Sequence, residues 1–398
     1  MSRPFRTRIL FFSACAGILV FGIVFAVLGT VFGLADARAL FGINLAQQGT
    51  LFLLLYLGVF LASLIVGPLI DHLGHKVNLL VSSAIVSGAM LGFAFAHSFL
   101  AASFASFLLG LGGGGLNTST NSLVSDLYGK QRGPMLNLLG IFFGIGALFV
   151  PLLAASIQGH LTITQLFVFC AVIAAICSVA YALIPFPPCG SVQGFSLAQT
   201  LGVAKYEGVL LLAFILFFES GNEASIGGWT STYVNSAGFS PRAATLALAA
   251  YWGALMAGRI LAARALRAIG KSRLVVASAL LSLIGCAVLL TSNLLSSLTL
   301  GAVLIGLSYG PVFPTTLAIA GDRYPKQGGT VFGLLFSVAL IGGMLLPWTV
   351  GRVSQRLGVH MGMVVPGIGA VGITVLSTIV MLRELQTRKL TNASETAS

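Results

Sequence analysis

The chain has 398 residues, of which 57% are hydrophobic and 8% are charged, and its mean hydropathy is +1.01. A soluble domain carries about 25% charged residues, so this composition excludes an ordinary soluble protein and indicates a polytopic membrane protein. The formal net charge of +12 could point to nucleic acid, but the positions of the basic residues between apolar segments argue against that partner. We therefore expect a lipid bilayer, and no nucleic acid, as the surroundings of this chain.

Apolar runs of about 20 residues, the length that crosses a bilayer, recur along the whole chain. The first run is about 26 residues long, against 7–15 for a signal peptide, so we expect it to be retained. Twelve spans are predicted, at residues 9–35, 47–70, 77–97, 99–125, 134–158, 163–185, 208–233, 243–264, 273–292, 295–320, 329–351 and 360–382.

The lysines and arginines predict the orientation of these spans. With the N-terminus in the cytoplasm, most of the 21 basic residues fall on the inner side, as the positive-inside rule requires. We therefore expect a multi-pass protein of the cell membrane (inner or plasma membrane) with both termini cytoplasmic. The five cysteines show no metal or redox spacing, and we expect neither a metal nor a cofactor.

The second half of the chain repeats the first. Residues 126–133 (DLYGKQRG) and 322–329 (DRYPKQGG) share an aspartate, a tyrosine, a lysine, a glutamine and a glycine in register, at an offset of 196 positions. Six spans followed by six in the same orientation form a parallel repeat, whose two bundles can rock about a central solute in alternating access. We expect an N-terminal bundle at 1–185, a cytoplasmic linker at 186–206, a C-terminal bundle at 207–383 and a cytoplasmic tail at 384–398.

Residues 110–115 (GLGGGG) satisfy the dinucleotide-binding pattern G-x-G-x-x-G. No strand precedes them, and they lie inside a long apolar run, so the nucleotide interpretation fails. We expect these glycines to allow close packing of helices.

The segment 67–76 (GPLIDHLGHK) joins the second and third spans. It resembles the loop signature of the major facilitator superfamily, G-x-L-x-D-r-x-G-r-k, with His72 and His75 where that family usually has arginine or lysine. The resemblance implies that Asp71 engages a helix N-terminus and neighbouring cations, which locks one conformation at the cytoplasmic side.

The matching region of the second half keeps glycines and cations but lacks the aspartate. Asp322 then becomes the expected counter-ion of Arg259 or Arg264. We assign the gate to Asp71, Lys76, Arg132, Arg259 and Asp322.

Four further segments, 41–49, 112–121, 223–229 and 306–315, look like the fucose permease and sodium-dependent glucose transporter branch of that superfamily. The resemblance implies an all-α membrane protein with twelve transmembrane helices in two six-helix pseudo-symmetric bundles, the major facilitator fold. It also implies secondary transport of a sugar, as symport with protons or sodium, from a cavity lined by spans 1, 4, 7 and 10. In the fucose permease the working acids lie on spans 1 and 4. Here those spans carry none at midplane depth, which leaves the choice between H⁺ and Na⁺ open.

Glu219 and Glu223 stand inside the apolar run 209–233, where an ionisable side chain is costly and is usually functional. Four residues at a 1.5 Å rise place them about 6 Å apart on one face. Two carboxylates this close in a low-dielectric cavity cannot both ionise cheaply, so we expect them to share a proton. We predict that both take part in ion coupling and that Glu223 also binds the sugar.

A sugar pocket needs amides, carboxylates and flat aromatic rings. Asn117 and Asn121 share a helix face through their i, i+4 spacing. Interhelical hydrogen bonding is the alternative for any single asparagine, an interfacial belt position is the alternative for Trp229, and a buried structural carboxyl is the alternative for Glu223. The predicted substrate-binding residues are Glu223, Asn222, Glu219, Trp229, Asn117, Asn121, Asn137, Gln47, Tyr251 and Tyr309.

Other functions compete with that of a sugar transporter that works as a monomer. An exporter of drugs or metabolites would use the same fold, but the asparagines and the tryptophan favour a hydrophilic solute. An enzyme is disfavoured because no His/Asp/Glu cluster has metal spacing and no Ser/His/acid set converges. ATP drive within this chain is excluded because no G-x-x-x-x-G-K-[ST] is present.

Overall fold

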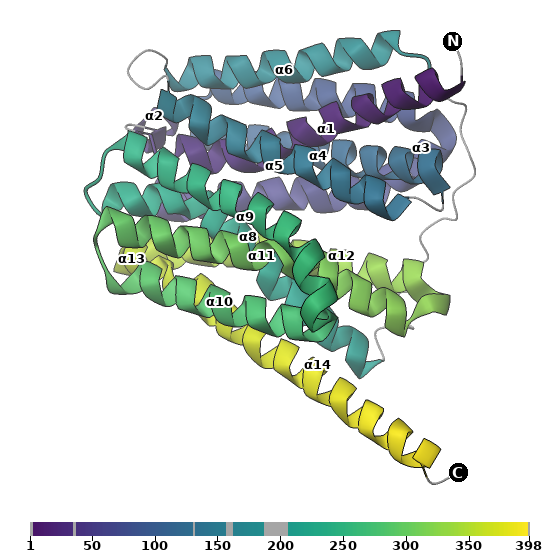
Figure 1. Ribbon diagram of the computed structural model, residues 1–398. Coiled ribbons are helices and arrows are strands. Elements are labelled where there is room, and N and C mark those ends of the chain that lie inside the picture. The colour runs from purple at the N-terminus through teal and green to yellow at the C-terminus, as the bar shows by residue number, and fades with distance from the viewer. Residues whose placement is uncertain (1–2, 35–36, 130–131, 157–161, 187–205, 397–398) are drawn as a thin grey trace.

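The computed structural model describes residues 3–34, 37–129, 132–156, 162–186 and 206–396, and it is helical over nearly all of them. Figure 1 shows the helices running side by side along one direction. In chain order they are α1 (Arg3–Val31), α2 (Ala37–Phe41), α3 (Leu45–Ala94), α4 (Phe99–Tyr128), α5 (Arg132–Ser156), α6 (Ile163–Leu183), α8 (Glu207–Ser236), α9 (Pro241–Ile269), α10 (Lys271–Thr291), α11 (Leu295–Arg323), the 3₁₀ turn η2 (Pro325–Gln327), α12 (Gly328–Leu357), α13 (Val359–Gly362) and α14 (Val364–Thr396).

In the described part of the chain, 11 helices are long and apolar enough to cross a membrane. They account for the twelve predicted spans because α3 has 50 residues and contains both the second and the third span. A helix of that length would measure about 75 Å, more than twice the hydrocarbon core. Its interior breaks at Gly74, where φ is 80° and ψ is 166°, so α3 is two spans joined by a sharp turn.

The second half repeats this turn. Gly270 has φ 82° and ψ 166°, nearly the same as Gly74, and it lies 196 positions further along the chain. A positive φ is strained for any residue with a Cβ, so glycine is required at both places. Capping repeats as well: the side chains of Asn44 and Ser240, also 196 apart, accept hydrogen bonds from the backbone N–H groups of Gln47 and Ala243 in the first turns of α3 and α9.

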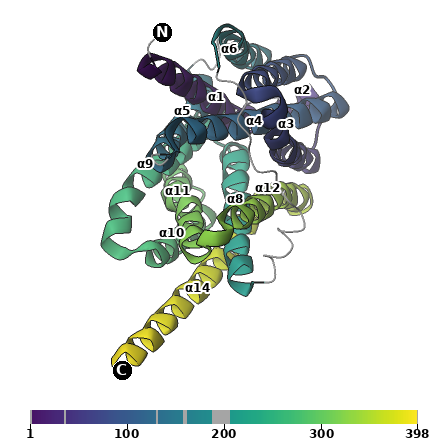
Figure 2. The same cartoon turned by 90° about the vertical axis from the view of Figure 1, so that its right-hand side faces the viewer.

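The two halves of the molecule are arranged in the same direction. Figure 1 shows the start of α1 and the end of α14 at one end of the molecule, with α2 and α13 at the opposite end. In Figure 2, α1–α6 form one group and α8–α14 another. Across the boundary α3 packs on α12 and α5 packs on α9. The domain boundaries remain a prediction, and most of the predicted linker lies outside the described residues.

Close approach of helices depends on glycine in both halves. A Cβ on Gly110 of α4 would overlap the carbonyl group of Leu55 on α3, and a Cβ on Gly306 of α11 would overlap that of Tyr251 on α9. These two contacts are again 196 positions apart. The packing interpretation of residues 110–115 is therefore confirmed.

At the end that holds α2 and α13, which we call the closed end, the two halves touch directly. The backbone N–H of Leu45 donates to Gln355 Oε1 over 3.0 Å, and Gln48 Nε2 donates to Thr232 Oγ1 over 3.1 Å. Deeper along the same seam, the Ser231 hydroxyl donates to the carbonyl oxygen of Gly29. These contacts join α1, α3, α8 and α12 around the closed end.

Candidate functional site

The two acids of α8 lie near the middle of that helix. Glu219 and Glu223 follow its first residue by about 18 Å and 24 Å of helix rise, in a helix of 30 residues. Glu219 is fully buried, and neither of its carboxylate oxygens has a hydrogen-bond partner among the described residues. The Glu223 side chain is 14% exposed. The structure thus places two carboxylates one turn apart, one of them enclosed and without a hydrogen-bond partner.

Among the described residues, Arg259 on α9 forms an ion pair with one of these acids. Its Nη2 lies 3.9 Å from Glu223 Oε2, and its guanidinium lies 5.4 Å from the centroid of the Phe143 ring on α5. The prediction that Asp322 pairs with Arg259 or Arg264 is wrong, because the Asp322 carboxylate is bound by Lys271. Arg259 points toward the middle of α8, whereas Asp322 lies at the far end of α11.

Asn222 and two tyrosines surround the acid pair. Asn222 Nδ2 donates to Tyr309 Oη and to the carbonyl oxygen of Pro366, both over 2.9 Å, while its Oδ1 is buried with no partner in the described part. Tyr251 Oη donates to the backbone carbonyl of Glu223 over 3.3 Å. The Asn222 amide therefore ties α8 to α11 and α14, and its oxygen is left as an acceptor.

The asparagines of α4 behave differently. Asn121 Nδ2 donates to the Asn117 backbone oxygen over 2.8 Å and to Asn117 Oδ1 over 2.9 Å. Both side chains are half-buried. The shared face predicted from their spacing is confirmed, and their mutual hydrogen bonds stay within one helix.

The other three predicted sugar-binding residues lie in three different environments. Trp229 is fully buried, with its ring 6.2 Å from that of Phe52, which excludes a lipid-interface belt position. Gln47 serves in the capping box of α3, where it exchanges hydrogen bonds with Asn44, and the buried neighbour Gln48 is the one that faces the interior. Asn137 lies on the exposed surface of α5.

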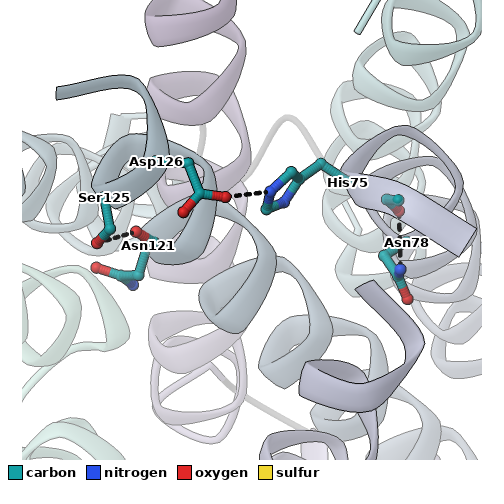
Figure 3. A network of polar contacts seen from close by, with 6 residues as sticks. His75, Asn78, Asn121, Ser125 and Asp126 are labelled. Carbon is teal, nitrogen blue, oxygen red and sulfur yellow. Dashed lines mark hydrogen bonds and ion pairs between the residues drawn. The ribbon is translucent and has the colours of Figure 1, made fainter. Parts of the chain in front are cut away.

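Two equivalent polar pairs, which we call latches, join α3 to α4 and α10 to α11, and of the predicted gate residues only Asp322 belongs to them. His75 Nε2 lies 3.0 Å from Asp126 Oδ2, and Figure 3 shows this imidazole reaching from α3 to the carboxylate on α4. In the second half Lys271 binds Asp322. Both members of each pair are related to the other pair by 196 positions. The sequence analysis missed His75 and Lys271 as partners, although the repeat offset relates them directly.

For the other predicted gate residues the structure gives their positions. Asp71 and Lys76 lie on α3, one on each side of the Gly74 turn, and both are half-buried. The side chain of Arg132 lies outside the described residues.

A surface hollow with a cavity volume of about 570 Å³ lies on α12 and contains none of the predicted residues. It is lined by Trp348, Thr349, Arg352, Val353, Arg356 and Leu357.

Comparison with known proteins agrees with this architecture. The family model described as Major Facilitator Superfamily matches residues 10–347 and 209–397. Among solved structures, that of a mutant of the nucleoside transporter NupG is similar to 95% of this chain and 99% of its own, with a TM-score of 0.78 at 13% sequence identity. At that identity the likeness shows the fold alone.

Three curated relatives are transporters by their descriptions. The uncharacterized MFS-type transporter YfkL of Bacillus subtilis (strain 168) is 24% identical over 77% of this chain and 80% of its own length. The glucose/mannose transporter GlcP of the same organism is 26% identical over 73% of this chain and 75% of its own. The glucose/galactose transporter of Brucella abortus biovar 1 (strain 9-941) is 26% identical over 41% of this chain and 40% of its own.

Proposed function

The chain belongs to the Major Facilitator Superfamily, and on that premise we propose that it is a secondary active transporter of a hexose-like sugar, coupled to H⁺ or Na⁺. The observation that carries this proposal is the acid pair of α8. A buried carboxyl group without a hydrogen-bond partner costs stability, so a protein retains one where it has a use. A small cation, as a proton or as sodium, is the ligand that such a carboxylate lacks.

The polar groups around the pair suit a sugar. Asn222 Oδ1 is a buried acceptor with no partner in the described part, and Glu223 is open to solvent by 14%. Hydroxyl groups of a sugar donate to acceptors of this kind, and the aromatic ring of Tyr251, whose hydroxyl bonds the Glu223 carbonyl, suits its apolar faces. The names of two curated relatives, a glucose/mannose and a glucose/galactose transporter, support the same solute class.

The transport cycle is alternating access between the two halves. With both termini on the cytoplasmic side of the cell membrane, the closed end faces outward, and the latches at Asp126 and Asp322 face inward. The latches then act at the inner side, as the gate assignment of Asp71 requires. The acid pair lies between the two ends, where a central site must lie to be reached from both sides.

Uptake by purified protein in proteoliposomes tests this function. Labelled glucose, galactose and mannose are supplied with an imposed proton gradient, an imposed sodium gradient, or neither. We expect one gradient to drive accumulation of at least one hexose above its outside concentration. Absence of both accumulation and hexose counterflow would refute the sugar assignment.

The acid pair is tested in the same vesicles. We expect Glu223→Gln and Glu219→Gln to abolish gradient-driven accumulation, because neither amide can release a proton or provide a full negative charge for sodium. Glu207→Gln, at the exposed start of the same helix, is the matched control and should accumulate like the parent. If both variants accumulate hexose like the parent, neither carboxylate is the coupling site.

A further inference from the structure

Arg259 is in contact with both halves of the molecule. It belongs to α9 of the second half and lies 3.9 Å from Glu223 on α8. The same guanidinium lies over the ring of Phe143, 5.4 Å from its centroid, on α5 of the first half. One side chain thus connects the predicted coupling acid with the boundary across which the halves must move.

The α5–α9 seam is built to let Arg259 reach Phe143. A Cβ on Gly140 would lie 3.8 Å from Arg259 Nη1, and a Cβ on Gly144 would lie 3.2 Å from the Met256 side chain. Two small residues one turn apart allow this approach. Phe143 in turn packs edge-on against Trp252 of α9, with centroids 6.1 Å apart and planes at 77°.

The pairing of Arg259 with Glu223 is incomplete. A separation of 3.9 Å is an ion pair without a hydrogen bond, and Arg259 Nε is buried with no partner among the described residues. Arg259 pairs with Glu223 alone, and Glu219 lies one turn away on the same helix. Among the described residues, the other titratable groups near the pair are the phenol hydroxyls of Tyr56 on α3, Tyr251 on α9 and Tyr309 on α11.

We propose that Arg259 competes with the coupling cation for Glu223, and that Phe143 passes the outcome to the seam between α5 and α9. This inference rests on the proposed function. It adds that a basic side chain of the protein itself occupies the position that the coupling cation takes. Without a cation, Arg259 is held between Glu223 and Phe143 and fixes the seam. When a proton or sodium neutralises Glu223, the attraction is lost, Arg259 withdraws, and the seam is released.

Trp252 offers a readout that needs no solute. The chain has three tryptophans, so Trp229→Phe with Trp348→Phe leaves Trp252 as the sole emitter, next to Phe143. The purified protein in lipid nanodiscs is titrated with NaCl replacing choline chloride at constant pH, and separately with acid in choline chloride. We expect the Trp252 emission to shift in one arm, and that arm identifies the cation. No shift in either arm would overturn the proposal.

Variants made in this single-tryptophan background test whether Arg259 competes with the cation or only stabilises the fold. Arg259→Gln should remove the emission shift, whereas Arg264→Gln, the same charge loss on an exposed part of the same helix, should keep it. If the ion pair holds about nine-tenths of the molecules, its loss should raise the apparent cation affinity about tenfold. That affinity is obtained by fitting the dependence of the melting temperature on cation concentration. An Arg259→Gln variant with the parental shift and the parental affinity would overturn the proposal.

A second variant covers the case in which Arg259→Gln does not fold. Arg259→Lys keeps the charge but lacks the planar group that stacks on an aromatic ring, so we expect a smaller emission shift than in the parent. A full-size shift would exclude Phe143 as the relay. Failure of hexose uptake with an intact, Arg259-dependent shift would refute the sugar assignment alone. Cation-driven hexose uptake without any shift would refute the relay alone.

Discussion

Replacing Glu219 with leucine should stabilise the protein and stop transport at the same time. Glu219 is fully buried on α8, and both of its carboxylate oxygens lack a hydrogen-bond partner in the described part of the chain. Leucine has a similar volume and carries no polar atom. The substitution therefore removes a desolvation penalty without opening a cavity.

The size of the gain follows from that penalty. A buried polar group without a partner costs about 1–3 kcal/mol in protein mutational data. For a large domain, each kcal/mol shifts the melting temperature by about 2–4 °C. We therefore expect Glu219→Leu to raise the melting temperature by several degrees.

The assay is thermal unfolding of the purified protein in detergent, followed by hexose accumulation in proteoliposomes. Glu219→Gln is the companion variant, since it keeps two polar atoms in the buried position and should give little of the gain. A melting temperature of Glu219→Leu below that of the parent would show that the carboxyl group stabilises the fold. The reasoning that treats it as a functional group kept at a cost would then be wrong.

Three further outcomes are expected from the latches and the seams. Asp71→Asn should slow transport while the equilibrium affinity for the solute stays within a few-fold of the parent's. The test compares uptake rates with binding affinities. A large loss of affinity would move Asp71 into the solute site. Lys271→His should make the second latch pH-dependent near neutrality, as a histidine titrates there. Its uptake rate should then fall with rising pH more steeply than that of the parent or of Asp322→Asn, which has no ion pair in the second latch. Gly29→Val should separate the halves at the closed end, because a Cβ there meets the Gly227 backbone. Hydrogen exchange in the second half of α8 should then rise. Unchanged exchange would contradict the close packing described for this seam.

The membrane spans could be predicted from the sequence because hydropathy is a local property. The repeat could be predicted because it needs only a comparison of the chain with itself. Span positions follow from hydropathy alone, and the break at Gly74 falls between the second and third predicted spans. The offset of 196 also relates His75 to Lys271 and Asp126 to Asp322, so the second latch could have been predicted once the first was known. The wrong pairing of Asp322 arose because charge alone was matched, without applying the offset.

The neighbours of the acid pair could not be predicted, because tertiary packing decides them. Arg259 and Glu223 are 36 positions apart on adjacent helices, and Phe143 belongs to the other half of the chain. Nothing in the local pattern specifies that these three side chains meet. Gln47 and Gln48 show the same limit at smaller scale, since adjacent residues on a helix point about 100° apart and only the fold decides which one faces inward.

The hydrogen bonds of the closed end have a thermodynamic consequence for motion. The bond from the Leu45 N–H to Gln355 joins two exposed groups, and water can take the place of either partner when the halves separate there. Opening at this rim therefore exchanges hydrogen bonds with water and leaves no buried donor orphaned. The exposed bond therefore contributes little to the free-energy difference between closed and open forms, whereas the bonds of Gln48 and Ser231 are buried and hold more of the cost of opening.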